Sequence, residues 1–513
     1  MKKIKILLSG RLDLGPLGRH MLSFIETLSQ SPRYQIHIDQ HYTDLFKCDS
    51  LSTTKLLEHY TSQNNIFIAN DKDDYDFGIY TDLLTLNYDD NLYQEFLRKN
   101  CTIRICYEVF DGSIPPLDWI DIINDNFDIC LSPSIYISQS LSSAGIKVPC
   151  FNLPCTVFNE ELLKKEVKIK SNCYRFGFIG GAEQRKNLLK TIEAFYQTFK
   201  DNPKVELYIH SSYSAEPEYL EQVKNKVEYY TSKGSNIVFS FGNHLEQDEM
   251  YDLIATFNFY IYPSKTTGYF TTPAEALSIG TPVIITDIPV HQELLHNLSD
   301  NDGIFRIKAT IPEPIQHSYL GMKYLGVQYD CSIDDINKQL ISAFNKVDIL
   351  FTPESIAKRK SRGKLYGLNS VSPLYHAIIS PTEFIVSQKS YANKNGTFQC
   401  TDFTLSQKYK SIHPYLNICY QDTTPNQIND NLQLKIYDQH NTKIIEKLCI
   451  EIEQKKFFGN TPNLPNLTKR EKFLNKTMEL TFKHNLSYSI KILYRVLKIY
   501  AIVKRTFCGK AKK

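Results

Sequence analysis

Short apolar runs alternate with longer amphipathic stretches along the first two thirds of the chain. This alternation is typical of parallel βαβ units, in which helices cover the faces of a buried sheet. The strands of a first series are expected at residues 3–9, 34–38, 65–69, 77–80, 102–107 and 127–132. Those of a second series are expected at 175–179, 205–210, 237–241, 259–262 and 282–286, with helices at 190–199, 219–232, 247–256 and 273–279.

The pattern therefore predicts an α/β protein built from two Rossmann-like domains. We expect the first domain at residues 1–158 and the second at 172–369, joined by the charged stretch 159–171. A glycine-containing loop at 10–18 follows the first strand. It leads into a helix whose expected inward positions are Met21, Leu22, Ile25 and Leu28. Such domains bind ligands at the carboxyl ends of their strands, so a cleft between the two sheets is the expected site.

The pattern changes after residue 369. Apolar and polar residues alternate at 432–437 and again at 448–452, with a turn-forming cluster between them, which predicts a hairpin. We assign 370–466 to a small β-rich accessory module of unknown role. Residues 467–513 are predicted to form a basic helical tail.

The charge divides along the same boundary. The 513 residues carry a formal charge of +3, but 467–513 hold 13 Lys and Arg against 2 Asp and Glu, or +11, which leaves −8 on the rest. Twelve cysteines are scattered without a C-x-x-C pair, and neither an export signal nor an uncharged apolar run of membrane-spanning length is found. We therefore expect a cytoplasmic protein.

The tail segment 485–507 predicts a basic amphipathic helix, with Ile490, Leu493 and Leu497 on one face and Lys491 and Arg495 interleaved. Such a helix can lie on an anionic membrane surface, which makes the protein peripheral on the inner face of a membrane. The same helix could instead dock on the acidic remainder of the chain. Nucleic acid is not expected as a partner, because no binding module accompanies the charge.

The segment 263–277, Pro-Ser-Lys-Thr-Thr-Gly-Tyr-Phe-Thr-Thr-Pro-Ala-Glu-Ala-Leu, connects a strand to a helix. Gly268 permits close backbone approach, and Thr272 with Pro273 suits the start of a helix whose N-terminus attracts anions. The alternative is a capping box, in which Glu275 only satisfies the backbone of the helix.

Together with its neighbours, this segment resembles the nucleotide-sugar glycosyltransferases of the GT-B architecture, specifically the large retaining family 4. Phe178-Ile179-Gly180 followed by Arg185-Lys186-Asn187 resembles the donor-phosphate segment of that family, in its Arg-Lys-Asn variant. The resemblance extends over about residues 1–370. The matching positions of the second domain are Gly268, Tyr269, Glu275, Ala276, Gly280, Pro282, Val283 and Glu293. Those of the first include Tyr107-Glu108, Pro115-Pro116, Trp119 and Phe127 to Ser134.

The resemblance implies a transferase that moves a sugar from a nucleoside-diphosphate sugar to a glycan or lipid-linked glycan, in surface polysaccharide or glycoconjugate biosynthesis. Retention of configuration and independence of metals are expected, with no cofactor beyond the sugar donor. An enzyme of this kind must stabilise the charge that builds up on the leaving diphosphate. The alternative is a catalytically degenerate GT-B protein that binds glycans or acts as a membrane scaffold.

Arg185 and Lys186 are the expected catalytic cations, and Glu108 is expected to orient an acceptor hydroxyl. Alone, the first two could lie in a solvated loop, and Glu108 could serve in a cap or loop. Expected donor contacts come from the amides around Gly268 to Thr272, and Glu275 is expected to accept from ribose hydroxyls. The expected donor-binding set is Gly180, Gly181, Gly268, Tyr269, Thr271, Thr272 and Glu275, and Gly15 and Gly18 are expected in a loop that faces acceptor or diphosphate.

Two positions depart from the family pattern. The first Glu of its Glu-x7-Glu pair falls on Thr267, which removes a carboxylate near the sugar, and its Gly-Arg falls on Gly180-Gly181. Arg185 is the expected replacement for the missing guanidinium. The Asp-x-Asp pairs within residues 71–76 precede an expected strand, and there we favour a solvated acidic turn over a metal site.

Overall fold

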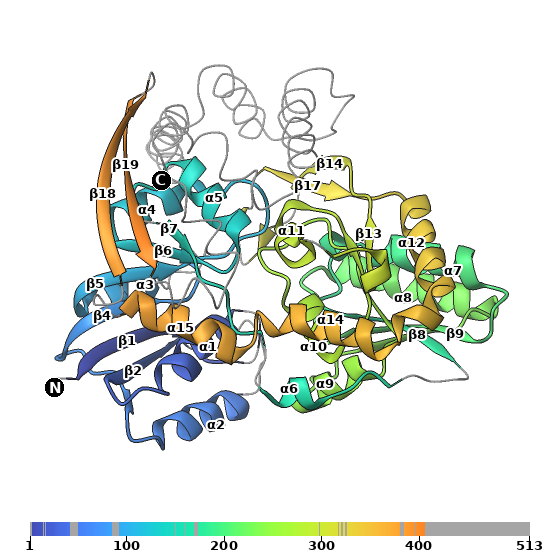
Figure 1. The fold of residues 1–513 in the computed structure, drawn as a ribbon, viewed down its shortest axis with the longest axis horizontal. Coiled ribbons are helices and arrows are strands. Elements are labelled where there is room, and N and C mark those ends of the chain that lie inside the picture. Colours follow the sequence, from blue (N-terminus) through green and yellow to red (C-terminus); the bar gives the residue numbers. More distant parts are fainter. Residues whose placement is uncertain are drawn as a thin grey trace, which may run out of the picture.

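The computed structural model describes residues 3–405 except 14, 16, 42–49, 85–91, 149, 158–159, 169–172, 297, 316–317, 320–321, 324–325, 380–383 and 394–395. Two α/β domains lie side by side, the first blue to cyan and the second green to yellow in Figure 1. The hairpin expected within 432–452 and the helix expected at 485–507 lie outside the described residues.

The first domain contains a seven-stranded sheet in the order β3-β2-β1-β4-β5-β6-β7, and all its neighbouring strands are parallel. Its strands are β1 (Ile4–Arg11), β2 (Tyr34–His41), β3 (Ile66–Ile68), β4 (Asp74–Tyr80), β5 (Asn100–Tyr107), β6 (Ile129–Ser132) and β7 (Cys150–Asn152). Its helices are α1 (Gly18–Leu28), α2 (Ser50–Thr61), α3 (Leu92–Arg98), α4 (Leu117–Asn126) and α5 (Ile135–Ala144). The six expected strands are confirmed, and β7 is an addition.

The second domain contains a six-stranded parallel sheet in the order β10-β9-β8-β11-β12-β13. Its strands are β8 (Tyr174–Ile179), β9 (Val205–Ser211), β10 (Ile237–Phe241), β11 (Phe259–Tyr262), β12 (Val283–Thr286) and β13 (Ile304–Ile307). Its helices are α7 (Leu188–Phe199), α8 (Pro217–Ser232), α9 (Gln247–Ala255), α10 (Thr271–Ile279), α11 (Pro289–Leu295), α12 (Ile333–Asn345), α13 (Val347–Leu350) and α14 (Pro353–Lys364), with 3₁₀ turns η1 (Gln184–Lys186) and η2 (Asp300–Asp302). The two-domain α/β expectation is therefore confirmed.

Smaller elements connect and edge these sheets. A short helix, α6 (Glu160–Lys164), lies inside the stretch expected to be a linker. Two antiparallel pairs follow the second sheet, β14 (Ile311–Pro314) with β17 (Val327–Asp330) and β15 (Ser318–Tyr319) with β16 (Met322–Lys323). A longer hairpin of β18 (Phe384–Asn393) and β19 (Gly396–Leu405) begins the segment that we assign to the accessory module.

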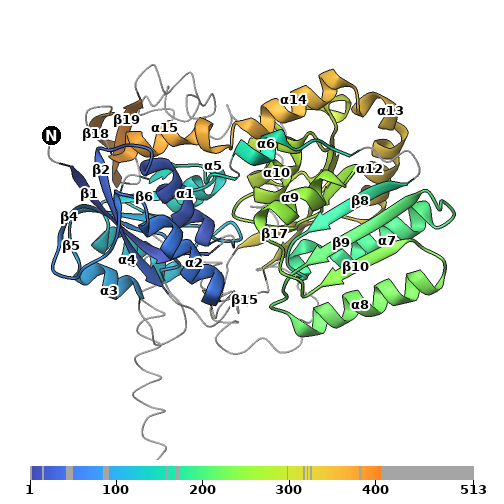
Figure 2. The ribbon, with the colours of Figure 1, turned by 90° about the horizontal axis from the view of Figure 1, so that it is seen from below.

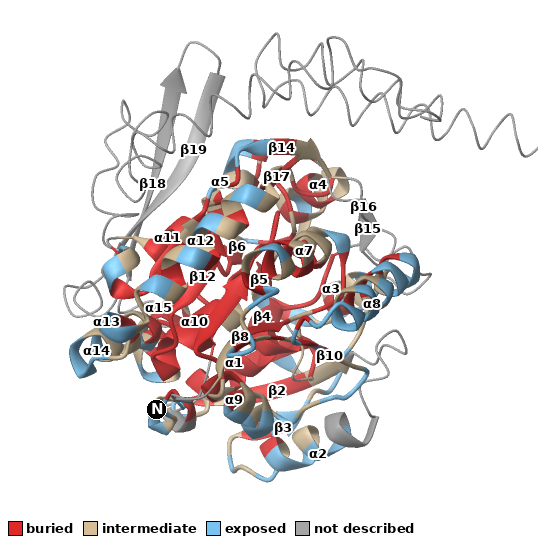
Figure 3. Cartoon of the chain, turned by 90° about the vertical axis from the view of Figure 1, so that its right-hand side faces the viewer, coloured by how far each residue is buried: buried red, intermediate tan, exposed pale blue. Residues whose placement is uncertain are grey.

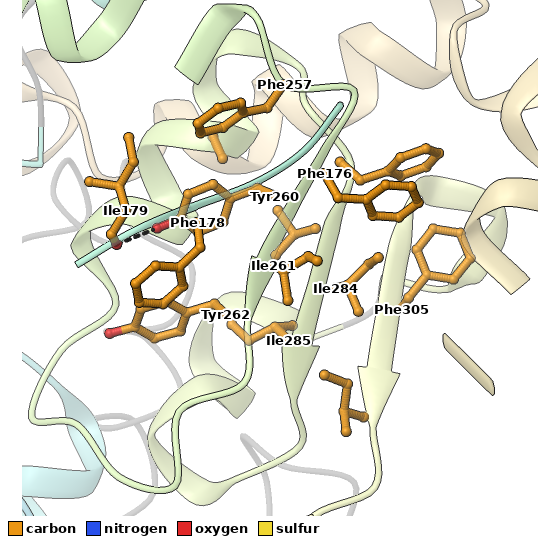
Figure 4. Close-up of a cluster of buried hydrophobic side chains, with 14 of the residues drawn as sticks. Phe176, Phe178, Ile179, Phe257, Tyr260, Ile261, Tyr262, Ile284, Ile285 and Phe305 are labelled. Atoms are coloured by element: carbon orange, nitrogen blue, oxygen red, sulfur yellow. Dashed lines mark hydrogen bonds between the residues drawn. The ribbon is translucent and has the colours of Figure 1, made fainter. Parts of the chain in front are cut away.

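Buried apolar residues of the strands and helices form the core of each domain, and buried residues occupy the centre of the molecule in Figure 3. The four inward positions predicted on α1 are all buried. In the second domain, Phe176 of β8 stacks on Phe259 of β11 with ring centroids 4.6 Å apart. Tyr260 satisfies its buried hydroxyl by donating to the Ile179 carbonyl at 3.0 Å (Figure 4). Runs of apolar residues in these strands are thus explained by burial on both faces.

A helix from beyond the second domain completes the first one. α15 (Leu368–Ile379) packs on α1, and Figures 1 and 2 show the orange α15 beside the blue α1. Tyr375 meets Phe24 edge to face at 4.7 Å and donates a hydrogen bond to the Pro154 carbonyl at 3.1 Å. The core of the first domain therefore includes residues after 369, which the boundary drawn from the sequence leaves out.

The packing of α15 is testable with a matched pair of isoleucines. Ile379 is fully buried in the first domain, whereas Ile341 on α12 is 47% exposed. We expect Ile379→Ala to lower the free energy of unfolding of the first domain by about 2–5 kcal/mol and Ile341→Ala by less than about 1 kcal/mol. Urea unfolding can be followed by the fluorescence of Trp119, the only tryptophan, which is buried in this domain. Equal shifts for both variants would contradict this role of α15.

Candidate active site at the domain interface

The segment between β11 and α10 lies directly against the first domain. A side chain on Gly268 would overlap Val109 and stand only 2.9 Å from the Phe110 carbonyl oxygen. Ser134, the N-cap of α5, donates its hydroxyl to the Gly268 carbonyl at 3.1 Å. The close backbone approach expected at Gly268 thus occurs against protein, because the loop after β5 occupies the space that a side chain would need.

Hydrogen bonds inside the segment define its path. The Thr267 hydroxyl donates to the Tyr269 carbonyl at 2.7 Å, and the Ser264 hydroxyl donates to the Thr266 carbonyl at 2.7 Å. Tyr269 donates to the Cys155 carbonyl at 3.1 Å, which anchors the segment to the chain that follows β7. The residue that replaces the family glutamate is therefore buried and holds the loop in shape.

Helix α10 begins differently from the expectation. It starts at Thr271 with Phe270 in the N-cap position, so Thr272 lies within the helix, and no described side chain caps its first turn. The capping-box interpretation is wrong, because Glu275 makes no hydrogen bond within the described chain and is only 1% exposed. Burial raises the pKa of Glu275 to about 8, although the charge of Arg19 in the first domain lowers it in part. The carboxyl is therefore neutral at pH 7.

Lys186 is buried at the end of the 3₁₀ turn that follows β8. Its ammonium donates to the Tyr262 hydroxyl at 2.7 Å and lies 4.8 Å from the centre of that ring. His291 packs beside Tyr262, and burial together with the nearby charge of Lys186 lowers its pKa to about 3. Among the described residues no carboxylate pairs with Lys186. Its burial excludes a solvated loop.

Arg185 has a different environment from its neighbour. Its guanidinium pairs with Asp111 of the first domain at 3.3 Å and with Glu183 at 2.8 Å. Burial opposes its charge, but these two carboxylates hold the pKa of Arg185 well above its ordinary value. Arg185 thus connects the two domains, and most of its charge is compensated before any ligand binds.

A buried carboxylate that sequence reasoning missed connects the turn after β8 with the segment after β11. Asp330 accepts from the Asn187 amide at 2.8 Å and the Lys190 ammonium at 2.5 Å, and it pairs with Lys265 at 3.0 Å. Burial raises its pKa, yet the hydrogen bond from Lys190 and the charge of Lys265 lower it below the ordinary range. Asn187 adopts a left-handed backbone with φ of 60°, the one such non-glycine residue in the described chain. That asparagine, within Arg-Lys-Asn, was the only signal that could have indicated this cluster.

The two glycines after β8 continue the sheet edge toward this site. Gly180 donates its amide to the His210 carbonyl at 3.2 Å. A side chain on Gly181 would stand 3.1 Å from the ring of Tyr213. Both residues therefore lie at the carboxyl edge of the sheet, next to the turn that carries Lys186.

Glu108 follows β5 and is fully buried, and neither of its carboxyl oxygens has a hydrogen-bond partner in the described chain. Burial and the neighbouring charge of Asp82 raise its pKa well above the ordinary value. Asp82 itself pairs with Arg11 of β1 at 3.0 Å. A capping role is excluded, since a capping carboxylate would accept backbone hydrogen bonds.

The glycine loop before α1 folds around Asp13. Gly15 donates its amide to the Asp13 carboxylate at 2.7 Å, and a side chain on Gly18 would overlap the Asp13 backbone. Gly15 also accepts from the Arg19 amide at 3.0 Å. The loop and the first turn of α1 thus form one compact structure at the carboxyl end of β1, on the side of the domain interface.

Comparison with known proteins decides the class of this two-domain structure. Residues 173–312 match the family described as glycosyl transferases group 1. HepE of Anabaena, solved in complex with UDP, aligns over 73% of this chain and 99% of its own length, with a TM-score of 0.51 and 12% identity. A glycosyltransferase of Rickettsia africae aligns over 74% and 100%, with a TM-score of 0.53 and 12% identity. The chain has the GT-B fold.

Sucrose-phosphate synthase of Thermosynechococcus elongatus is similar to this chain over 74% of the chain and 98% of its own length, with a TM-score of 0.51 and 12% identity. Identities this low establish the fold alone. No curated protein matches the sequence. In the described part of the chain, no helix combines the length and apolar character needed to cross a membrane.

The acidic segment at residues 71–76 differs from the expectation in one respect. Asp74 and Asp76 lie inside β4 and do not precede it. Asp71 pairs with Lys99, and Asp76 accepts the Lys5 amide at 2.8 Å. Across the described ranges, no three His, Cys, Asp or Glu side chains gather as metal ligands.

The raised pKa of Glu275 predicts a specific pH dependence of stability. The folded protein binds the proton of Glu275 more tightly than the unfolded chain does. The stability that the protonated carboxyl contributes is therefore fully present below about pH 4.5 and is lost as pH rises through about 8. Between pH 5 and pH 8, the wild type should lose on the order of a few kcal/mol of stability relative to Glu275→Gln. Urea unfolding at both pH values measures this difference.

The control for that experiment is Glu221→Gln, which removes the same charge from a side chain that is 64% exposed. This variant should follow the wild type at both pH values. If the stability of Glu275→Gln also follows that of the wild type at both pH values, Glu275 is ionised in the folded protein.

Proposed function

We propose that this enzyme transfers a sugar from a nucleoside-diphosphate sugar to a glycan or lipid-linked glycan, with retention and without a metal ion. The observation that carries the proposal is that Lys186 and Glu275 are both buried and both lie near the tyrosines of β11. Lys186 donates to Tyr262, and burial together with the charge of Glu275 raises the pKa of Tyr260, two residues earlier on the same strand. A cation and a hydroxyl-binding group are thus present in one region of the second domain, as binding of a nucleoside diphosphate requires.

The chemistry follows from these groups. When the bond between the anomeric carbon and the diphosphate oxygen breaks, the electron pair leaves with the diphosphate, and Lys186 would stabilise that charge. The acceptor oxygen bonds to the anomeric carbon, and its proton passes to the departing diphosphate. Glu275 would accept hydrogen bonds from the ribose hydroxyls, which favour its ionised form. The crystal structures of HepE with UDP and with UDP-glucose support a nucleotide sugar as the donor.

Donor binding tests this assignment directly. We expect Lys186→Ala and Glu275→Ala each to weaken binding of the donor by at least about tenfold, since each removes a buried charged or hydrogen-bonding contact. Calorimetric titration with UDP-glucose and a panel of other nucleotide sugars measures the affinity. Lys338→Ala, on a side chain that is 72% exposed, is the control and should bind as the wild type does.

Turnover separates this proposal from a degenerate GT-B protein. Slow hydrolysis of a bound donor supports the enzyme, and binding of glycans without any donor binding would favour the scaffold. Activity that survives EDTA and a product whose anomeric configuration matches the donor, read by NMR, would support metal independence and retention.

We further propose that the cytoplasmic enzyme binds an anionic membrane through residues 485–507. The charge of +11 on 467–513 supports this proposal, because basic residues are attracted to acidic lipid headgroups. In liposome flotation, the full chain should float with vesicles containing phosphatidylserine, whereas a chain ending at Asn466 should stay at the bottom. Equal flotation of both proteins would refute the membrane role, and flotation of neither would favour docking on the acidic body.

A further inference from the structure

Arg19, in the first turn of α1, is a buried cation whose guanidinium makes no hydrogen bond within the described chain. Burial lowers the pKa of Arg19, but nearby groups, Glu26 first among them, outweigh burial and raise it. The residue is 6% exposed, and within the described chain its only ion pair is with Glu26 at 3.9 Å, too long for a hydrogen bond. A guanidinium carries five N–H donors, and burying them without acceptors is costly. The side chain is therefore equipped to bind an anion that the structure does not contain.

Glu275 of the second domain also lacks hydrogen-bond partners, but as an acceptor where Arg19 is a donor. It is 1% exposed, and one of its carboxyl oxygens is fully enclosed without a hydrogen-bond partner in the described residues. Hydrogen bonds connect the two sides: the Cys155 thiol donates to the Arg19 carbonyl at 3.5 Å, and Tyr269, just before α10, donates to the Cys155 carbonyl at 3.1 Å. Consistently, the charge of Arg19 lowers the pKa of Glu275 across the domain interface. They nevertheless make no hydrogen bond or ion pair with each other. Two strong binding groups from different domains thus border one buried region, each with unused capacity.

The backbone holds Arg19 in place while its side chain stays uncommitted. Its amide donates to the Gly15 carbonyl at 3.0 Å, and its carbonyl accepts from the Ser23 hydroxyl at 2.7 Å. Ser23 also contacts the Thr156 hydroxyl at 2.8 Å, on the segment that leaves the first domain. The guanidinium is therefore presented from a rigid support, as preorganised binding requires.

We propose that Arg19 binds the diphosphate of the sugar donor from the first domain, an inference that rests on the proposed function. In any nucleoside diphosphate, the ribose hydroxyls and the first phosphate are separated by only a few bonds. A ligand whose ribose meets Glu275 therefore brings its phosphates toward Arg19. The added cation is needed, because Arg185 is already neutralised by Asp111 and Glu183, which leaves Lys186 alone. A guanidinium also matches the geometry of a phosphate through two parallel hydrogen bonds.

The test compares a nucleoside diphosphate with its own nucleoside. UDP and uridine, and GDP and guanosine, are titrated calorimetrically into the full chain and into Arg19→Gln. We expect the variant to bind the diphosphate that the wild type prefers more than about tenfold more weakly, with nucleoside affinity changed by less than about twofold. Arg19→Lys, which keeps the charge and loses the bidentate geometry, should recover part of the affinity. The exposed Arg33→Gln should match the wild type.

Each outcome discriminates between roles. Equal losses for diphosphate and nucleoside would show that Arg19 shapes the site without touching phosphate, and unchanged affinity for both would exclude any contact. Either result overturns the role of Arg19 while the proposed function stands. A wild-type protein that binds neither diphosphates nor nucleosides would instead defeat the proposed function. If thermal unfolding shows that Arg19→Gln folds poorly, the Arg19→Lys variant provides the test instead. Wild-type affinity of Arg19→Lys for the diphosphate would rule out bidentate recognition by Arg19.

Discussion

The contact between the Gly268 backbone and the loop after β5 is the constraint on which the site depends. A side chain at this position would strike Val109 and the Phe110 carbonyl, so only glycine lets the two domains meet here. The surrounding polar contacts then become possible, among them Ser134 to the Gly268 carbonyl and Arg185 to Asp111. The segment that carries the donor-side residues is consequently shaped by both domains, and neither sheet alone would form the site.

Burial divides the carboxyl groups of this interface into two kinds. Asp330 remains ionised because lysines and an amide surround it, and it serves as the fixed support for the loops around Lys186. Glu275 and Glu293 form no ion pair in the described chain, and burial raises their pKa values to about 8 and about 7. Glu293 accepts the Ile135 amide at the start of α5, whereas Glu275 has no described hydrogen-bond partner. Of these two, Glu275 therefore has more capacity left for a ligand.

Local pattern was sufficient for the elements of the two sheets, because strands buried on both faces are continuous apolar runs and their connecting helices are amphipathic. The local pattern could not predict features that depend on contacts between residues far apart in the sequence. The return of α15 to the first domain follows from packing of Tyr375 on Phe24, about 350 residues apart in sequence. Likewise, the motif placed Arg185 and Lys186 on one turn, but only the fold pairs Arg185 with Asp111. Local sequence also suggested a cap at Glu275, which tertiary burial overrides.

The replacement of the family glutamate by Thr267 affects charge more than shape. The threonine hydroxyl bonds to the Tyr269 carbonyl, so the segment keeps a defined path although the carboxylate is absent. Lys186 and Glu275 reach the interface from η1 and α10, outside that hydrogen-bonded turn. Because neither depends on a carboxylate at position 267, the groups suited to a nucleoside diphosphate persist without it. At position 267 itself, a neutral hydroxyl bonded to its own loop stands in place of a carboxylate. Under the proposed function, this departure affects the choice of sugar and leaves the nucleotide contacts of Lys186 and Glu275 in place.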